Sequence, residues 1–151
     1  MPFAAFLRSR RPTRLEQRRG AAVALGNAGE RVAERHLKRG GFRVLGRNVR
    51  LVNGELDLVV QQRATGLRVV VEVKAGRAHP TRRPAMRAGR AKRRKLASLT
   101  RTLAKLNGWA GQPLRIDVVE VVWPRGGPSD RRGVPKAEPV VSHQVGSVFR
   151  V

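Results

Sequence analysis

The chain has 151 residues, and 33 lysines and arginines against 10 aspartates and glutamates give it a formal net charge of +23. This length predicts one domain whose core needs no disulfide or metal to hold it together. The absence of cysteine excludes a disulfide scaffold, a thiol nucleophile and a cysteine-ligated zinc site. No apolar run approaches the ~18 residues of a membrane-spanning helix. The charge favours a polyanionic partner, although arginine-rich codon usage would also produce a basic surface that binds nothing.

Residues 1–22 carry scattered arginines and little periodic apolar content, which predicts a flexible basic arm. They lack the apolar segment and cleavage site of a signal peptide, so we expect a cytoplasmic protein, with a basic transit peptide as the alternative. From about Val23 as far as Leu37, apolar residues recur at spacings of three and four, and two glycines follow. This pattern predicts the first helix.

Three strands are expected next. Residues 42–49 and 54–61 are typical of the first two, because apolar and polar residues alternate along them. Residues 67–74 are β-branched and mostly apolar, as a central strand should be. The intervening Arg-Ala-Thr-Gly at 63–66 is typical of a turn.

The second half of the chain begins with a basic region, because no acidic residue occurs between Ala75 and Arg115. Within it, leucines at helical spacing predict a helix over 86–106, and a fourth strand is expected over 114–123. After Pro124 the composition shifts to Gly, Pro, Ser and Arg, with one extended piece expected in the last dozen residues. The order αβββαβ predicts an α/β fold with a central mixed sheet flanked by helices. We expect a basic arm, an α/β domain and a linker with a C-terminal tail, over residues 1–22, 23–124 and 125–151.

Acidic residues are scarce, yet Glu55, Asp57 and Glu72 fall inside the two most hydrophobic strands. Strand alternation places Glu55 and Asp57 on one face, and likewise Glu72 and Lys74. If the turn at 63–66 closes a hairpin, Asp57 lies opposite Glu72, and Glu55 lies opposite Lys74. Opposed side chains have Cβ atoms ~4.5–5.5 Å apart, and two carboxylates at that distance resist joint ionisation unless a cation lies between them.

This spacing predicts a metal-dependent nuclease. Magnesium suits the carboxylate pair, because it takes hard oxygen ligands together with water and phosphate oxygens. Lys74 would orient or deprotonate a water, or stabilise the charge that develops on phosphorus. The alternative is that the acids lie on a solvated face and that Glu55 and Lys74 form only an ion pair.

Four motifs, in chain order, carry a resemblance to a known family: Gly26-Asn-Ala-Gly-Glu30, Gly54-Glu-Leu-Asp57-Leu, Val71-Glu72-Val-Lys74 and Arg115-Ile-Asp117-Val-Val. They resemble the YraN family of uncharacterised bacterial proteins over about residues 23–124. That family is similar to archaeal Holliday-junction resolvases. The resemblance implies the restriction-endonuclease-like three-layer core of the PD-(D/E)xK nucleases.

The resemblance also implies roles for particular residues. Asp57 and Glu72 would be the metal carboxylates, with Glu30 as an extra acidic ligand and Lys74 as the catalytic lysine. The implied cofactor is Mg²⁺, for which Mn²⁺ can substitute.

Two residues are expected to support the site, namely Glu55 and Asp117. The chain departs from the family pattern at two points. Glu-Leu stands before Asp57 where a proline is usual, and Ala75 follows Lys74 where arginine or threonine is common. We expect the alanine to weaken a substrate contact and to leave the metal site intact.

The basic helix and the loop before it are the expected DNA contact, with a solvated face as the alternative. The residues concerned are Arg77, Arg82, Arg83, Arg87, Arg90, Arg94, Lys95 and Arg101. Aromatic residues make up only 4% of the chain, which favours recognition of the backbone and shape of duplex or branched DNA. No glycine-rich phosphate loop or paired-histidine spacing is present, so neither a nucleotide cofactor nor zinc is implied.

The sequence thus predicts a Mg²⁺-dependent, structure-directed DNA endonuclease of repair or recombination. The alternatives are a non-catalytic DNA- or RNA-binding protein on the same scaffold, and a basic RNA- or ribosome-associated factor. A homodimer would suit a junction substrate, because resolution of a junction needs two cuts.

Overall fold

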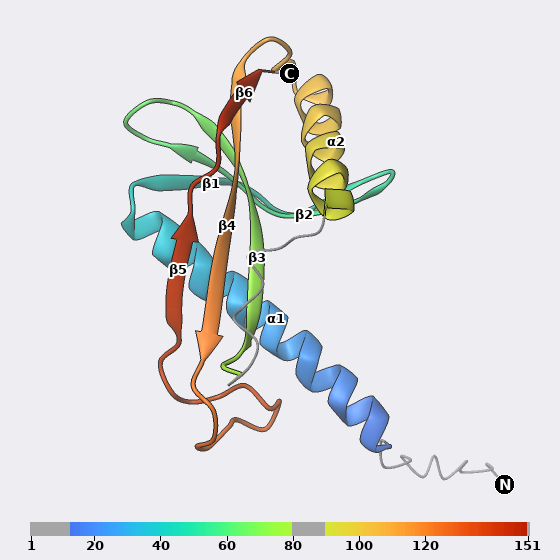
Figure 1. The fold of residues 1–151 in the computed structure, drawn as a ribbon, viewed down its shortest axis with the longest axis vertical. Coiled ribbons are helices and arrows are strands. Elements are labelled where there is room, and N and C mark those ends of the chain that lie inside the picture. The colour runs from blue at the N-terminus through green and yellow to red at the C-terminus, as the bar shows by residue number, and fades with distance from the viewer. Residues whose placement is uncertain (1–12, 80–89, 151) are drawn as a thin grey trace, which may run out of the picture.

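The structure, a computed structural model, describes residues 13–79 and 90–150, which form a mixed β-sheet with one helix on each face (Figure 1). The elements are α1 Arg14–Arg39, β1 Phe42–Leu51, β2 Gly54–Gln62, β3 Arg68–Arg77, α2 Arg90–Leu106, β4 Pro113–Trp123, β5 Val140–Gln144 and β6 Val148–Arg150. The predicted α/β class and the order αβββαβ are therefore confirmed, and the architecture is compatible with a nuclease-like fold. Over the described ranges, no helix is both long and apolar enough to cross a membrane.

Helix α1 begins at Arg14, well before the expected start near Val23. Its first turn is closed by a capping box, in which Glu16 N–H donates to Thr13 Oγ1 and Thr13 N–H donates to the Glu16 carboxylate. Apolar spacing marks only the part of a helix that is buried, whereas a cap starts a helix without burying anything. The part of the expected arm at residues 1–12 lies outside the described residues.

The sheet has the strand order β1-β2-β3-β4-β5, and β6 also pairs with β4. Strands β1, β2 and β3 are antiparallel neighbours, while β3 and β4 run parallel with α2 as the connection between them. The C-terminal tail was expected to add one extended piece, and it forms two strands. They pair antiparallel with successive stretches of β4, and residues 145–147 connect them.

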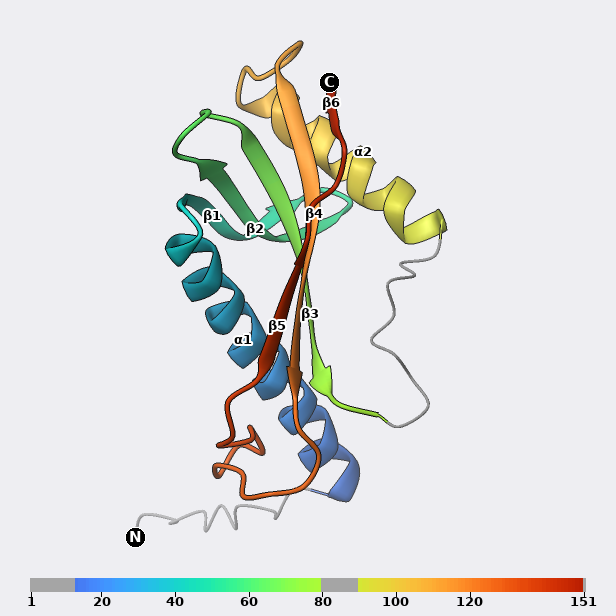
Figure 2. The same ribbon diagram turned by 60° about the vertical axis from the view of Figure 1, so that its left-hand side comes forward.

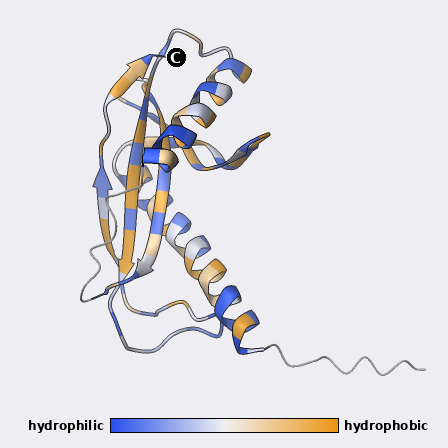
Figure 3. Ribbon diagram, turned by 45° about the vertical axis from the view of Figure 1, so that its right-hand side comes forward, coloured by the Kyte–Doolittle hydropathy of each residue, from blue (hydrophilic) through white to orange (hydrophobic). Residues whose placement is uncertain are grey.

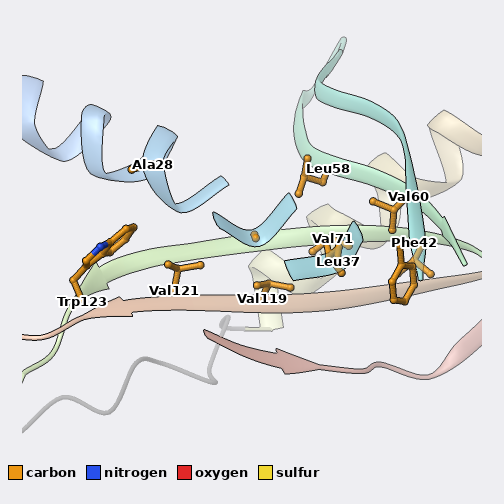
Figure 4. Packing of buried hydrophobic residues seen from close by; sticks show 11 residues of the cluster. Ala28, Leu37, Phe42, Leu58, Val60, Val71, Val119, Val121 and Trp123 are labelled. Carbon is orange, nitrogen blue, oxygen red and sulfur yellow. The ribbon is translucent and has the colours of Figure 1, made fainter. Parts of the chain in front are cut away.

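The two faces of the sheet bury different residues. Helix α1 packs on one face against a cluster that includes Leu58, Val71 and Val119 (Figure 4). Helix α2 covers the other face with three leucines at helical spacing, as the sequence predicts; these are Leu96, Leu99 and Leu103. Leu106 was expected on the same buried stripe, but it is exposed at the last residue of the helix. Figure 3 shows the consequence as alternating hydrophilic and hydrophobic bands along α2 and long hydrophobic stretches along β4.

Strand β2 separates from β3 part-way along its length. The two strands pair in the predicted register from Gln61 and Arg68 as far as Leu58 and Val71, and no further. Beyond that point β2 stays paired with β1, and the β1–β2 turn extends toward α2 (Figures 1 and 2). Leu56 consequently packs with α2, although Leu58, two residues later, packs with α1. The strand therefore twists strongly at Asp57, where a flat hairpin was expected.

Candidate metal and nucleic-acid site

The candidate site lies where β2 leaves β3. Asp57 is the first residue of β2 beyond the paired stretch, and its Oδ2 accepts a hydrogen bond of 2.7 Å from Val73 N–H of β3. The Asp57 carboxylate thus replaces a backbone carbonyl as the hydrogen-bond acceptor for Val73 N–H. This bond holds Asp57 beside Glu72, the residue that precedes Val73, so the expected pairing of the two acids is realised through a side chain.

Glu72 is buried, with 9% of its surface exposed, and two lysines neutralise it. Its Oε1 lies 2.7 Å from Lys74 Nζ and 2.5 Å from Lys92 Nζ. Burial by itself raises the pKa of Glu72, but the hydrogen bonds from the two lysines outweigh burial and lower it below its ordinary value. Glu72 is therefore ionised at neutral pH.

The pKa of Asp57 shifts in the opposite direction. Burial raises the pKa of Asp57 to about 6, although the bond from Val73 N–H works against that rise. The nearby charges of Glu72 and Glu30 raise the pKa further, whereas Lys92 lowers it. The ionised form of Asp57 is thus costly chiefly because the carboxylate is buried, and a bound cation would lower that cost.

Glu30 and Glu55 are linked through Asn48 at the edge of this site. With its amide nitrogen turned toward the acids, Asn48 donates to Glu30 Oε2 at 3.1 Å and to Glu55 Oε1 at 3.0 Å. Asn48 has a φ of 46°, and asparagine is one of the few residues that tolerate this left-handed conformation. The residue thus turns out of the regular strand at the point where it bridges the two acids.

The expected pairing of Glu55 with Lys74 is wrong. Glu55 lies across from Arg50 of β1, with Glu55 Oε2 at 3.4 Å from Arg50 Nε. The reason is the separation of β2 from β3, since Glu55 belongs to the stretch of β2 that no longer pairs with β3.

Asp57 and Glu72 lie together, but the acids of the site do not surround one metal position. Asp57 and Glu72 line one hollow of about 230 Å³, together with Glu55 of β2 and with Lys92 and Lys95 of α2. Among residues 13–79 and 90–150, no three acids or histidines lie close enough to hold one metal ion between them. Glu30 acts on Asp57 through its charge and is held by Asn48.

The family comparison covers the part of the chain that holds these residues. The model of the uncharacterised protein family UPF0102 matches residues 29–121, a segment that contains Glu30, Asp57, Glu72 and Lys74. The chain belongs to this family. The resemblance to the YraN family is thereby confirmed.

Curated relatives extend the match over most of their own length. A UPF0102 protein of Symbiobacterium thermophilum is 40% identical over 97 residues, which cover 64% of this chain and 80% of the relative. Another, from Clavibacter michiganensis, is 38% identical over 103 residues, covering 68% of this chain and 86% of the relative. A third, from Renibacterium salmoninarum, is 38% identical over 104 residues, with coverage of 69% and 86%.

Asp117 does not join the acids of this UPF0102 protein. It lies on the face of β4 that also carries Val119 and Val121, which pack with α1, whereas Glu72 and Lys74 lie on the α2 face. Asp117 is fully buried and accepts hydrogen bonds from Arg115 Nε and Nη2, both 2.8 Å long. His143 Nε2 lies 2.8 Å from Asp117 Oδ2, and Gly146 N–H donates to Oδ1 at 3.0 Å. Asp117 therefore fastens the C-terminal tail to β4.

Ala75 likewise faces away from the site. A Cβ added to Gly29 of α1 would lie 2.3 Å from the Cβ of Ala75, so α1 and β3 approach each other closely at these two residues. The Ala75 side chain thus packs beneath α1, on the face of β3 opposite Glu72 and Lys74, and the weakened substrate contact expected at position 75 stays a prediction.

The basic residues predicted to contact DNA fall into four groups. Lys95 lines the Asp57–Glu72 hollow, whereas Arg90, Arg94 and Arg101 lie on the exposed side of α2, opposite its leucines. Arg77 is exposed, but its Nη2 donates to Ser129 Oγ at 2.9 Å and to Gly133 O at 3.1 Å. Outside the described residues lie Arg82, Arg83 and Arg87.

Two residues of the site were not predicted to belong to it. Lys92, which binds Glu72, precedes Leu96 by four residues, and this helical spacing alone would have placed it on the buried side of α2. Glu120 of β4 is the register partner of Lys74 and is only 6% exposed, and its Oε1 has no hydrogen-bond partner among the described residues. Side chains at register positions of parallel strands share a face, so Glu120 adds a further buried acid beside Lys74.

Proposed function

We propose that this UPF0102 protein is a Mg²⁺-dependent DNA endonuclease that hydrolyses phosphodiester bonds in branched or otherwise structured DNA. One observation carries the proposal: Asp57 and Glu72, from two different strands, line one hollow with lysines directly beside them. A structural ion pair needs one acid and one base. Here two acids are brought together at the point where the sheet opens, and one of them is costly to ionise.

The residues present fit Mg²⁺. The ion takes hard oxygen ligands and is commonly bound by one or two carboxylates, with water and phosphate oxygens completing its shell. Asp57 and Glu72 supply those carboxylates, and the raised pKa of Asp57 marks a buried charge whose cost a cation would lower. When bound, Mg²⁺ would polarise the phosphate and lower the pKa of a coordinated water.

The chain's own residues would prepare the substrate. Val73 N–H fixes the orientation of the Asp57 carboxylate. Lys92 projects from α2 into the hollow, so it is available to a phosphate oxygen once the phosphate competes with Glu72 for its ammonium group. Lys74 would orient the attacking water or stabilise the charge that develops on the phosphate in the transition state.

Cleavage of labelled DNA tests the proposal directly. Duplex, single strand, flap and four-way junction would each be incubated with Mg²⁺, Mn²⁺ or EDTA. We expect cutting that requires the metal, and we expect Asp57→Asn and Glu72→Gln to reduce it to the level seen with EDTA. Binding should persist or strengthen in both variants, because each removes negative charge near a phosphate. Glu138→Gln is the matched control, since Glu138 is an exposed acid of the tail.

Two outcomes would contradict the assignment. The first is cleavage by Asp57→Asn at the rate of the unmodified chain. The second is an equal loss of binding and cleavage in both acid variants, which would show that the acids support the fold instead of the reaction. Thermal unfolding with and without Mg²⁺ adds a readout independent of activity, because a ligand that binds only the folded state raises its stability.

A non-catalytic nucleic-acid-binding protein is the second candidate. It is favoured by the lysines on Glu72, which already neutralise that acid without a metal. Under this alternative, no DNA in the panel is cut with either metal, and binding remains. Competition between DNA and RNA at one salt concentration would then identify the partner, since electrostatic affinity changes steeply with salt.

A further inference from the structure

A second hollow adjoins the carboxylate pair and has a different character. It measures about 340 Å³ and lies between α2, β4 and the segment that joins β5 to β6. Glu72, Lys74 and Lys92 form its wall on the side of the candidate site. The two hollows are thus adjacent, because Glu72 and Lys92 line both of them.

The chemistry of this second hollow changes along its length. Lys74, Lys92 and Arg93 supply positive charge at one end. The remainder is largely apolar and is lined by Ile116, Val118 and Phe149, with the exposed Ser147 at the rim. A nucleotide likewise has one charged end and one largely apolar end, because its phosphate is charged whereas its base is flat and mostly apolar with polar edges.

We propose that the second hollow receives the base of an unpaired nucleotide whose phosphate lies at the Asp57–Glu72 pair. The proposal rests on the proposed function and names its substrate class. A base that is stacked in an intact duplex cannot enter a pocket until it is unpaired and unstacked, and that step is unfavourable. The substrate would therefore carry unpaired nucleotides next to a duplex, as a flap or an imperfect branch does.

Three features support a nucleotide as the occupant. The volume falls within the ~300–1,000 Å³ that is common for small-ligand pockets. Positive charge lies next to the candidate catalytic acids, where a phosphate has to lie, because Lys74 and Lys92 both contact Glu72. The wall is also preformed, because Gly146 N–H donates to the buried Asp117, and a Cβ on Gly146 would lie 2.0 Å from Ile116 O.

The test compares binding of two DNAs that differ by a single base. One carries a single unpaired nucleotide beside a duplex, and the other carries an abasic residue at the same position. Affinities would be measured by fluorescence anisotropy in EDTA, so that no cleavage is needed. We expect the unmodified chain to prefer the DNA with the base by about tenfold, which corresponds to about 1.4 kcal/mol of binding free energy.

Two neighbouring exposed residues provide the variant and its control. Ser147→Phe places a bulky side chain in the hollow and should abolish the preference for the base. Val148→Phe changes the next residue, which does not line the hollow, and should leave the preference intact. Equal affinity of the unmodified chain for the two DNAs would overturn the proposal, and so would an undiminished preference in Ser147→Phe.

Failure of this proposal differs from failure of the nuclease proposal. A nuclease without a base pocket would cut DNA in an Asp57-dependent way and bind both probes equally. A base pocket without nuclease activity would discriminate between the probes in EDTA and cut nothing in Mg²⁺.

Discussion

Asp57 is the residue at which burial and charge conflict most clearly. Its carboxylate takes a backbone hydrogen bond from the neighbouring strand, yet burial and two nearby glutamates raise its pKa to about 6. The ordinary value for aspartate is 3.8, so between these two values the folded chain binds more protons than the unfolded chain. Asp57 therefore favours folding at low pH, and this contribution declines as the pH rises toward 6.

We predict that Asp57→Asn stabilises the metal-free protein at neutral pH. The asparagine keeps an oxygen for Val73 N–H and removes the charge. We expect the free energy of unfolding to rise by about 1 kcal/mol at neutral pH. The full pKa shift would correspond to a larger gain, at about 1.36 kcal/mol per unit, but the partial exposure of Asp57 to solvent reduces it. Denaturant unfolding in EDTA at about pH 4.5 and about pH 7.5 checks the sign, because the gain should shrink at the lower pH. A variant less stable than the unmodified chain at neutral pH would contradict this account.

Asp117 illustrates the opposite case, a buried acid with every oxygen engaged. We predict that Asp117→Ala destabilises the protein by about 3 kcal/mol or more, because the Arg115 guanidinium would stay buried without its partner. The strands β5 and β6 should show faster amide hydrogen exchange in the variant, since Gly146 and His143 also lose their contact. The exposed Glu138→Ala serves as the control, and a loss below about 1 kcal/mol in Asp117→Ala would refute the prediction.

At the level of elements, the distance between α1 and β3 depends on a glycine. Gly29 lets the helix approach Ala75, the residue after the candidate catalytic Lys74. Gly26 lies one turn earlier on the same helix, and a Cβ there would meet nothing within 4 Å. Within this one sequence motif, Gly29 is therefore needed for close packing, whereas Gly26 is not.

We predict effects of opposite sign for alanine at these two positions. Gly29→Ala should cost about 1–3 kcal/mol, because the helix or β3 has to shift to admit the methyl group. Gly26→Ala should gain roughly 0.5–1 kcal/mol, because alanine loses less backbone entropy than glycine in a helix. Thermal unfolding of both variants measures the difference, and changes of the same sign would show that the close contact at Gly29 does not limit packing.

Helix α2 carries positive charge on two sides, one of which faces the acids and the other solvent. Lys92 and Lys95 extend into the hollow with the acids, while Arg90, Arg94 and Arg101 point to solvent. The outer arginines would contact DNA only if it wrapped around the helix. The side chains nearest the acids are thus expected to dominate phosphate binding at the site.

At the scale of the whole molecule, the net charge of +23 makes affinity for any polyanion strongly dependent on salt. We predict that Arg93→Ser with Lys95→Ser lowers the slope of log K against log salt by about 2, at roughly 0.9 per phosphate contact. Arg18→Ser with Arg35→Ser removes the same charge from exposed positions of α1 and should change the slope far less. Titrations at several salt concentrations measure both slopes. Equal slopes for the two variants would mean that binding follows total charge and not the site.

Most of the secondary structure follows from local patterns in the sequence. Alternation and β-branched residues predict β1 to β4, the leucine spacing predicts α2, and the turn at 63–66 sets the register of β2 against β3. The start of α1 was missed because its first turns bury nothing and depend on a cap at Thr13. The tail was only partly predicted, since its two strands form against β4, far away in the sequence.

The sequence by itself determined the class of the fold, the family and the rare acids within hydrophobic strands, because these depend on residue type and short spacings. Only the tertiary structure decided which acids meet. The separation of β2 from β3 directs Glu55 to Arg50 and leaves Asp57 to bond with Val73 N–H. The packing of α2 brings Lys92 onto Glu72, and the parallel pairing of β3 with β4 sets Glu120 beside Lys74. These contacts join residues far apart in the chain, and a twisted sheet fixes them only when all its layers are packed.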